Sequence, residues 1–369
     1  MKGTLRDRFL ASTWAYPVAL FCVTRASLML ISGGALGLQP WLERAGGAPE
    51  LHPHLWIDGL CRWDCGIFIY LARDGYSTPD HANFFPLLPL LMRALAVVGI
   101  PYFIGVLVVA NVAALLAGVV TYRVFCKLAS PEAARWSLAV LAAFPFSFFQ
   151  AAGYPESLMM LFTALAVWYA LEGHGARAGI ALGIAVLARH VSILIGLVLP
   201  AAQLQQRGFK GFFKSPLQVL SLLLPFAISG VYLLWQQRVY GDPFTFWNVR
   251  ANWGGIAWWG AREVLSNPEA PPMFRLYLLF ALVPTVGVVA LWFKPQWRVL
   301  AAGGAVMMVV FWAVGAAGLG RYSASCWPAY LPIGVALVRW PMLQTPVLGF
   351  LGLCQGVAFV LHVHQYPIN

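Results

Sequence analysis

The chain has 369 residues, of which 60% are hydrophobic and only 10% are charged, and its mean hydropathy is +0.74. A soluble domain carries about 25% charged residues, and no soluble core of this length could bury so much apolar surface. The composition therefore excludes a soluble protein and predicts an integral membrane protein. The net charge of +11 comes from basic residues scattered singly or in short loops, which favours the positive-inside rule over nucleic-acid binding.

Apolar stretches recur along the chain, and many approach the roughly 20 residues that a helix needs to cross a bilayer. The first follows a basic start and lacks a clear small-residue cleavage site, so we interpret it as a retained span rather than a signal peptide. In chain order the predicted spans lie near residues 14–36, 85–100, 102–126, 134–152, 156–172, 178–203, 216–239, 274–293, 298–318, 326–340 and 346–363. The predicted fold is an all-α polytopic membrane protein, a single transmembrane domain over residues 1–369 with about eleven helices, or roughly nine if the shortest are re-entrant.

Basic residues in the connecting segments predict the orientation of these spans. The clusters before the first, seventh and ninth spans fall on one side, which we take as cytoplasmic. These clusters are Lys2, Arg6 and Arg8, then Arg207, Lys210 and Lys214, then Lys294 and Arg298. The segment with Lys127 and Arg135 falls on the opposite side in this count, which conflicts with the rule.

Two long hydrophilic segments then lie on the outer face, over residues 38–84 and 240–272, and they hold most of the acidic residues. The second contains four tryptophans, Trp247, Trp253, Trp258 and Trp259. A purely structural bundle needs only short connections, so long loops on one face indicate a site at that membrane surface. No internal repeat stands out, which argues against a transporter built from duplicated halves.

The first outer loop contains a predicted interfacial helix. Trp63, Ile67, Tyr70 and Leu71 fall at helical spacing and form an apolar stripe, and Gly75 is expected to end the helix. Asp64 then lies in the first turn, where the helix dipole stabilises an anion. The alternative interpretation of Asp64 is a residue that only stabilises the helix terminus.

Three parts of this loop carry a family resemblance: Arg62-Trp63-Asp64, Ala72-x-x-Gly75-Tyr76 and Phe84-Phe85-Pro86-x-x-Pro89. They resemble the first outer loop of the PIG-V family of mannosyltransferases, which belongs to the GT-C class of glycosyltransferases. Further segments follow in the family's order, namely Phe144-Pro145 with Tyr154-Pro155-Glu156-Ser157-Leu158, Ala188-Arg189-His190 and Arg321-Tyr322.

The resemblance spans residues 20 to 330 and is most specific in the first loop. It implies a bacterial-type relative with a GT-C-like fold, in which the loop over residues 38–84 is catalytic and the loop over residues 240–272 closes over donor and acceptor. The implied reaction is an inverting transfer of a sugar, expected to be mannose, from a polyprenyl-phosphate donor to a lipid or glycan acceptor at the outer face.

The chemistry of such a transfer suggests roles for particular residues. A carboxylate base takes the proton of the acceptor hydroxyl, and cations stabilise the leaving lipid phosphate. Asp64 is the expected base. Arg321, beside Tyr322 at the outer end of a span, is the first candidate for the phosphate because a guanidinium can bind two oxygens at once. Arg62 and Arg250 are further candidates for binding the donor phosphate.

Other residues are expected to contact substrate. Glu156 and Arg189 lie in or near apolar spans, where an unpaired charge costs roughly 2.5–3.5 kcal/mol. Glu156 is therefore expected to pair with Arg189 or Arg25, in a functional or a purely structural role. The complete set of expected substrate-binding residues is Trp63, Asp74, Tyr76, Phe84, Phe85, Glu156, Arg189 and Tyr322. For Asp74 a surface charge is the alternative, because ten residues of helix separate it from Asp64 by about 15 Å.

No cofactor is expected, because the chain has neither a glycine-rich phosphate loop nor a zinc motif, and no metal site is assigned. The donor must then be reachable from the membrane. Cys61 and Cys65 share the first loop and could pair in an oxidising compartment, but free thiols are the preferred interpretation. His362 and His364 are expected at the surface.

Three alternatives stay open. A transporter or flippase of a lipid-linked or polar substrate would depend on Arg25, Glu156 and Arg189, and Asp64 would be indifferent. Another outer-face transferase would differ mainly in its donor. A non-catalytic membrane partner would depend on the loop surface rather than on one carboxylate. The expected environment is the bacterial cytoplasmic membrane, because the other loops are short and the chain is compact, with membrane lipids and a lipid-linked sugar as partners and no nucleic acid.

Overall fold

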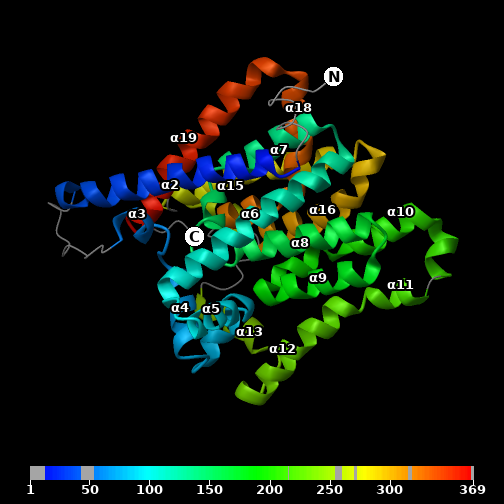
Figure 1. Ribbon diagram of the computed structural model, residues 1–369, viewed down its shortest axis with the longest axis horizontal. Helices are drawn as coiled ribbons and strands as arrows, with labels where there is room; N and C mark the ends of the chain where they lie inside the picture. The colour runs from blue at the N-terminus through cyan, green and yellow to red at the C-terminus, as the bar shows by residue number, and fades with distance from the viewer. Residues whose placement is uncertain are drawn as a thin grey trace.

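The computed structural model describes residues 13–42, 54–214, 216–253, 260–269, 272–314 and 318–366, and every regular element in these residues is a helix (Figure 1). The prediction of an all-α polytopic membrane protein is therefore confirmed. The α-helices are α2 (Ala15–Leu42), α3 (Leu55–Asp58), α4 (Asp64–Arg73), α5 (Leu87–Val97), α6 (Tyr102–Leu128), α7 (Pro131–Ala143), α8 (Glu156–Leu171), α9 (Gly175–Ala188), α10 (Val198–Phe213), α11 (Pro216–Ser221), α12 (Leu224–Tyr240), α13 (Thr245–Asn248), α14 (Gly260–Ser266), α15 (Pro272–Leu291), α16 (Arg298–Val314), α17 (Leu319–Ser325), α18 (Tyr330–Arg339) and α19 (Gln344–Val363). The 3-10 helices are η2 (Pro79–Asn83), η3 (Ser147–Gln150), η4 (His190–Leu197), η5 (Val249–Trp253), η6 (Pro295–Trp297), η7 (Trp327–Ala329) and η8 (Pro341–Leu343).

Six stretches of the described chain are long and apolar enough to cross a membrane, and each coincides with a predicted span. They are Ala15–Gly37, Tyr102–Leu128, Pro216–Tyr240, Phe274–Leu291, Pro295–Ala313 and Pro341–Val363. Shorter apolar helices complete the bundle, because a helix packed among neighbours can be shorter than one that faces lipid throughout.

The stretch over residues 85–100 is too short to cross the membrane as one helix, which agrees with the re-entrant alternative for the shortest predicted spans. Its helix, α5, has only 11 residues, or about 16 Å of helix. The chain turns at Gly99, whose φ of 85° is a conformation that favours glycine. Helix α5 packs on α4 and on α6 at one end of the bundle, where α3 and α13 also lie (Figure 1).

The predicted single span over residues 178–203 is instead a hairpin of two legs. Helix α9 ends at Arg189, whose backbone is extended with φ −152° and ψ 128°. The chain then returns through η4 and α10, so that the Gln206 amide donates to the carbonyl oxygens of Ala170 and Leu171, which directly precede α9. The sequence did not indicate this reversal, because both legs are apolar and the stretch between them carries no proline.

These two differences remove the conflict with the positive-inside rule. The Tyr16 hydroxyl at the start of α2 donates to the Arg135 carbonyl oxygen at 3.1 Å, and the Trp297 indole donates to the Leu128 carbonyl oxygen at 2.9 Å. The segment with Lys127 and Arg135 therefore lies at the same end of the bundle as the start of α2 and the basic connection before α16. The basic connections gather at one end, and α3, α4, α5 and α13 gather at the other.

Several legs of the bundle are broken, and neighbouring side chains satisfy the backbone groups that the breaks leave without partners. Helix α7 ends at Phe144-Pro145, so the predicted span over residues 134–152 continues only as η3. The Gln355 amide on α19 donates to the carbonyl oxygens of Ala142 and Phe144 at 2.9 and 2.8 Å. The predicted span over residues 326–340 is likewise divided, into η7 and α18.

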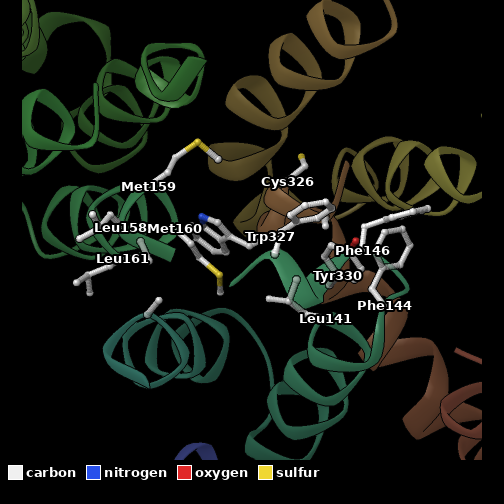
Figure 2. Packing of buried hydrophobic residues seen from close by; sticks show 14 of the residues in the cluster. Leu141, Phe144, Phe146, Leu158, Met159, Met160, Leu161, Cys326, Trp327 and Tyr330 are labelled. Atoms are coloured by element: carbon white, nitrogen blue, oxygen red, sulfur yellow. The ribbon is translucent and has the colours of Figure 1, made fainter. Parts of the chain in front are cut away.

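The core packs around Trp327 (Figure 2), which is fully buried and whose indole nitrogen donates to the Thr163 hydroxyl at 3.2 Å. Side chains of α8, including Met159 and Met160, lie on one side of it (Figure 2). Because the indole N–H has a partner, the tryptophan can fill the core without leaving a polar group unsatisfied.

Helices α7 and α18 approach each other closely at Gly334. A Cβ atom at this position would overlap the backbone nitrogen and hydroxyl of Ser137 and the carbonyl oxygen of Ala133. Small residues at such a contact let two backbones pack closely, which is a main source of stability between membrane helices.

We predict that Gly334→Ala lowers the thermal unfolding temperature of the detergent-purified protein by several degrees, because overpacking costs about 1–3 kcal/mol. The matched control is Gly349→Ala on α19, where a Cβ would meet nothing within 4 Å. This control should unfold at the same temperature or slightly higher, since alanine favours a helix over glycine. Equal unfolding temperatures for the two variants in a tryptophan-fluorescence melt would contradict the close contact.

Candidate active site

Charged side chains from four separate segments meet at the end of the bundle where the first outer loop lies. Asp64 begins α4, Glu156 begins α8, Arg189 follows α9, and Arg321 lies on α17. The breaks described above create this meeting point, since each of the last three residues lies where a leg of the bundle turns or starts.

The four side chains form one continuous ion-paired network. Arg321 Nη1 donates to Asp64 Oδ2 at 2.9 Å, and Arg321 Nε lies 3.3 Å from Glu156 Oε1. Arg189 Nη1 pairs with the same Glu156 oxygen, and Arg189 Nη2 donates to the Tyr322 hydroxyl at 3.3 Å. Two carboxylates thus neutralise two guanidinium groups, which offsets the cost of burying them.

Aromatic rings surround the Arg321 guanidinium. Its central carbon lies 5.6 Å from the ring centre of Phe149, 5.5 Å from that of Tyr154 and 5.5 Å from that of Tyr322. Cation–π contacts of this kind favour a desolvated guanidinium. The exposed fraction of the Arg321 side chain is only 9%, against 29% for Asp64, so Asp64 is the member of the pair that a substrate can reach.

Asp64 is the first residue of α4, as the sequence predicted, and Gly75 follows the C-cap residue of this helix with a φ of 88°. The buried face differs from the predicted stripe. It consists of Cys65, Phe68, Leu71 and Ala72, while Trp63 is exposed. The helix is therefore rotated so that Cys65 rather than Trp63 faces the bundle.

The second outer loop reaches this network through Arg250. Its Nη1 donates to His190 Nε2 at 2.8 Å, and because arginine only donates, His190 must accept with an unprotonated nitrogen. Burial lowers the pKa of Arg250, and the nearby Arg189 lowers it further, although Tyr322 opposes this. Within the described residues no carboxylate lies within 4 Å of Arg250, so it is the cation of this site with no anionic partner.

Tyr76, Phe84 and Phe85 are among the residues expected to bind substrate. They connect the two outer loops instead of surrounding Asp64. The Tyr76 hydroxyl donates to the Phe84 carbonyl oxygen at 2.8 Å, and Phe84 packs edge-on against Phe68. The Phe85 ring contacts three rings from other segments, those of Tyr232, His190 and Phe246. This aromatic cluster holds the first loop against α12 and the second loop.

A hydrogen bond completes the connection between the loops, from the Asn252 amide to the Asp80 carboxylate at 2.7 Å. Of the four tryptophans predicted in the second loop, Trp247 lies 5.7 Å from Arg250 in a cation–π contact. Trp258 and Trp259 lie outside the described residues.

Two of the predicted site residues, Asp74 and Arg62, make contacts of other kinds. Asp74 is exposed and pairs with its neighbour Arg73 at 2.8 Å, and the hydrogen bond from Arg73 lowers the pKa of Asp74. It is not part of the network, in agreement with the alternative of a surface charge. Arg62 contributes its carbonyl oxygen, which accepts a hydrogen bond from the Tyr154 hydroxyl at 3.0 Å.

The expected pairing of Glu156 is resolved in favour of Arg189. Arg25 instead donates from Nε to the Asn111 amide oxygen at 2.7 Å, and Asn111 donates to the Ala151 carbonyl oxygen at 2.9 Å. Arg25 and Asn111 thus support the turn after η3, next to the aromatic residues around Arg321.

Two further predictions are wrong. Cys61 and Cys65 form a disulfide, where free thiols were preferred, because the turn before α4 brings their Cα atoms to 5.2 Å. His362 is buried and packs against the Phe148, Phe149 and Tyr154 rings. Sequence reasoning also missed Phe149 and Tyr154 as the surroundings of Arg321, although the Tyr154-Pro155-Glu156 motif pointed to that turn.

No group of three or more His, Cys, Asp or Glu side chains in the described part of the chain could hold a metal ion. The site is instead built from carboxylates, guanidinium groups and aromatic rings. Such a set can accept a proton, bind an anionic group and stack on a sugar.

Comparison with known proteins identifies the family of the chain. A family model described as Mannosyltransferase (PIG-V) matches residues 50–233, which include Asp64, Tyr154, Glu156 and Arg189. The chain is 28% identical over 221 residues to GPI alpha-1,6-mannosyltransferase 2 of Rattus norvegicus, covering 52% of this chain and 44% of that protein. It is 28% identical over 226 residues to the Mus musculus protein of the same name, covering 58% and 44%.

The matched part thus amounts to less than half the length of each of these relatives. The family model covers the first-loop segment in which the most specific sequence motifs lie. The chain belongs to the PIG-V mannosyltransferase family.

Proposed function

We propose that this protein transfers a mannosyl residue from a polyprenyl-phosphate donor to a hydroxyl group of a lipid or glycan acceptor. The acceptor oxygen forms a bond to the sugar C1 carbon as the bond from C1 to the phosphate oxygen breaks, and the acceptor proton passes to Asp64. Attack from the face opposite the phosphate inverts the configuration at C1. The products are the mannosylated acceptor and the polyprenyl phosphate.

The observation that carries this proposal is the accessible Asp64 carboxylate held by the buried Arg321. Oδ2 is fixed by the hydrogen bond from Arg321, so the carboxylate keeps one orientation. The position of Asp64 at the start of α4 and the Arg321 guanidinium both place positive charge beside its carboxylate. A general base must be ionised and within hydrogen-bond reach of the proton it accepts.

Arg250 is the strongest candidate for binding the donor phosphate. Arg321 is already paired with two carboxylates, whereas a phosphate would supply Arg250 with an anionic partner and relieve its repulsion from Arg189. Charge-assisted hydrogen bonds to phosphate are about twice as strong as neutral ones. Arg321 lies behind Asp64 and is paired with both carboxylates, so its proposed contribution to the leaving phosphate is secondary to that of Arg250.

The outer, non-cytoplasmic face is the proposed location of this reaction. The first loop lies at the end of the bundle opposite the basic connections, and the positive-inside rule assigns that basic end to the cytoplasm. The Cys61–Cys65 disulfide supports the same assignment, because disulfides persist in oxidising compartments. A bacterial cytoplasmic membrane with its site on the periplasmic face fits both features.

The transporter alternative loses its main support. That alternative depended on Arg25, Glu156 and Arg189 and left Asp64 indifferent. Arg321 instead joins Asp64 and Glu156, and Glu156 pairs with Arg189, in one network. A pair that stabilises a catalytic arginine needs no role in transport.

We predict that Asp64→Asn lowers the rate of mannosyl transfer from synthetic polyprenyl-phosphate-mannose by about 10²–10⁴-fold, the usual contribution of a general base. Asp74→Asn, at the C-cap of the same helix, is the matched control and should stay within a factor of a few of the unsubstituted protein, since an exposed ion pair contributes little. Transfer of radiolabelled mannose into a lipid extract measures both. Full activity of a correctly folded Asp64→Asn variant would rule out this base.

We predict that Arg250→Gln raises KM for the polyprenyl-phosphate donor by about tenfold or more, which corresponds to a charge-assisted hydrogen bond of about 1.5–3 kcal/mol. The control is Arg262→Gln, an exposed arginine on α14 in the same loop. Initial rates over a range of donor concentrations separate KM from kcat. If both variants change KM equally, loop charge in general, and not Arg250, attracts the donor.

A further inference from the structure

The segment that carries Asp64 is closed into a small covalent ring. Cys61 and Cys65 form a disulfide across four residues, with 5.2 Å between their Cα atoms. The ring encloses Arg62, Trp63 and Asp64, so the carboxylate that meets Arg321 is bonded in sequence to one half of the disulfide.

Trp63, at the centre of the ring, has a backbone conformation that residues other than glycine rarely adopt. Its φ is 54° and its ψ is −121°, and among the described residues other than glycine only Gln365 also has a positive φ. Such a conformation persists only where the surroundings impose it. The Trp63 side chain is 39% exposed, whereas the covalent ring closes directly around its backbone.

The ring is docked on the turn that precedes Glu156. Cys65 is fully buried and packs on Gly153, where a Cβ atom would overlap its sulfur. The Gly153 N–H donates to the Leu60 carbonyl oxygen at 2.9 Å, and the Tyr154 hydroxyl donates to the Arg62 carbonyl oxygen at 3.0 Å. Ring and turn therefore form one unit, which joins the segment of Asp64 to the segment of Glu156.

We propose that the Cys61–Cys65 disulfide is a positioning device for Asp64. The closed ring holds Trp63 in its positive-φ conformation and starts α4 at Asp64, which aims the carboxylate at Arg321. Cys61 and Cys65 are positioning residues that need not touch the substrate. This inference rests on the proposed role of Asp64, and it makes the activity depend on an oxidised first loop.

Without the ring, Trp63 relaxes to a negative φ and the carboxylate loses its fixed position. The groups proposed to bind the donor, above all Arg250, lie on other segments and keep their places. The expected effect is therefore on kcat, with little change in KM for the donor. A misplacement of about 1 Å at a reacting group can cost roughly 10²-fold in rate.

The test compares Cys61→Ser, Cys65→Ser and the double variant with the unsubstituted protein in lipid nanodiscs. Cys22→Ser is the matched control, because Cys22 is an exposed free thiol on α2. We expect kcat to fall about 10–100-fold in the ring variants and to stay unchanged in the control. Amide hydrogen exchange over residues 60–72 should become faster in the ring variants only, and this readout does not require activity.

A reductant provides the second measurement on folded protein. A water-soluble phosphine cleaves the S–S bond, takes oxygen from water to become the phosphine oxide and leaves two thiols. It should lower kcat and raise exchange at residues 60–72 in the unsubstituted protein, and it should change neither in the double variant. This comparison separates loss of the ring from any misfolding caused by the substitutions.

Two outcomes would overturn the inference. One is a double variant with unchanged kcat while Asp64→Asn is inactive, which would leave the base in place without the ring. The other is unchanged hydrogen exchange after reduction or substitution, which would show that the ring does not order the loop. If the unsubstituted protein transfers no mannose at all, the proposed function fails, and the exchange measurement still decides the role of the ring.

Discussion

The buried guanidinium of Arg321 is the interaction on which the arrangement of this protein depends. An unpaired charge among apolar helices costs roughly 2.5–3.5 kcal/mol, and Arg321 avoids that cost only by meeting Asp64, Glu156 and a surround of aromatic rings. Arg321 and these partners lie on three segments that are far apart in the sequence. One charge therefore fixes the first outer loop, the start of α8 and α17 relative to one another.

The broken helices follow from the same requirement. A continuous helix across Arg189 would carry its guanidinium past Glu156, whereas the extended backbone at Arg189 ends α9 where the two side chains meet. The breaks also leave carbonyl oxygens without helical partners, and side chains such as Gln355 and Asn111 satisfy them. Polar residues in the bundle thus have a structural role that complements the charges of the site.

The proposed site combines a rigidly held carboxylate, the proposed base, with a more adaptable arginine, the proposed phosphate contact. Asp64 is held by Arg321, by the start of α4 and by the ring that contains it. Arg250 lies on an outer loop and reaches the network only through His190. This arrangement suits the proposed transfer, in which a large lipid-linked donor would enter and leave while a fixed carboxylate takes the acceptor proton.

The sequence by itself determined the class of the protein, the six long apolar stretches and the residues of the first loop, because hydropathy and local spacing are encoded over short distances along the chain. It also singled out Asp64, Glu156, Arg189 and Arg321 one at a time. Only the tertiary structure decided that Glu156 pairs with Arg189 rather than Arg25, that residues 178–203 form a hairpin and that Asp74 stays outside the site. Apolar legs that cross and legs that turn back look alike in hydropathy, and which charges meet depends on contacts between residues up to 257 positions apart.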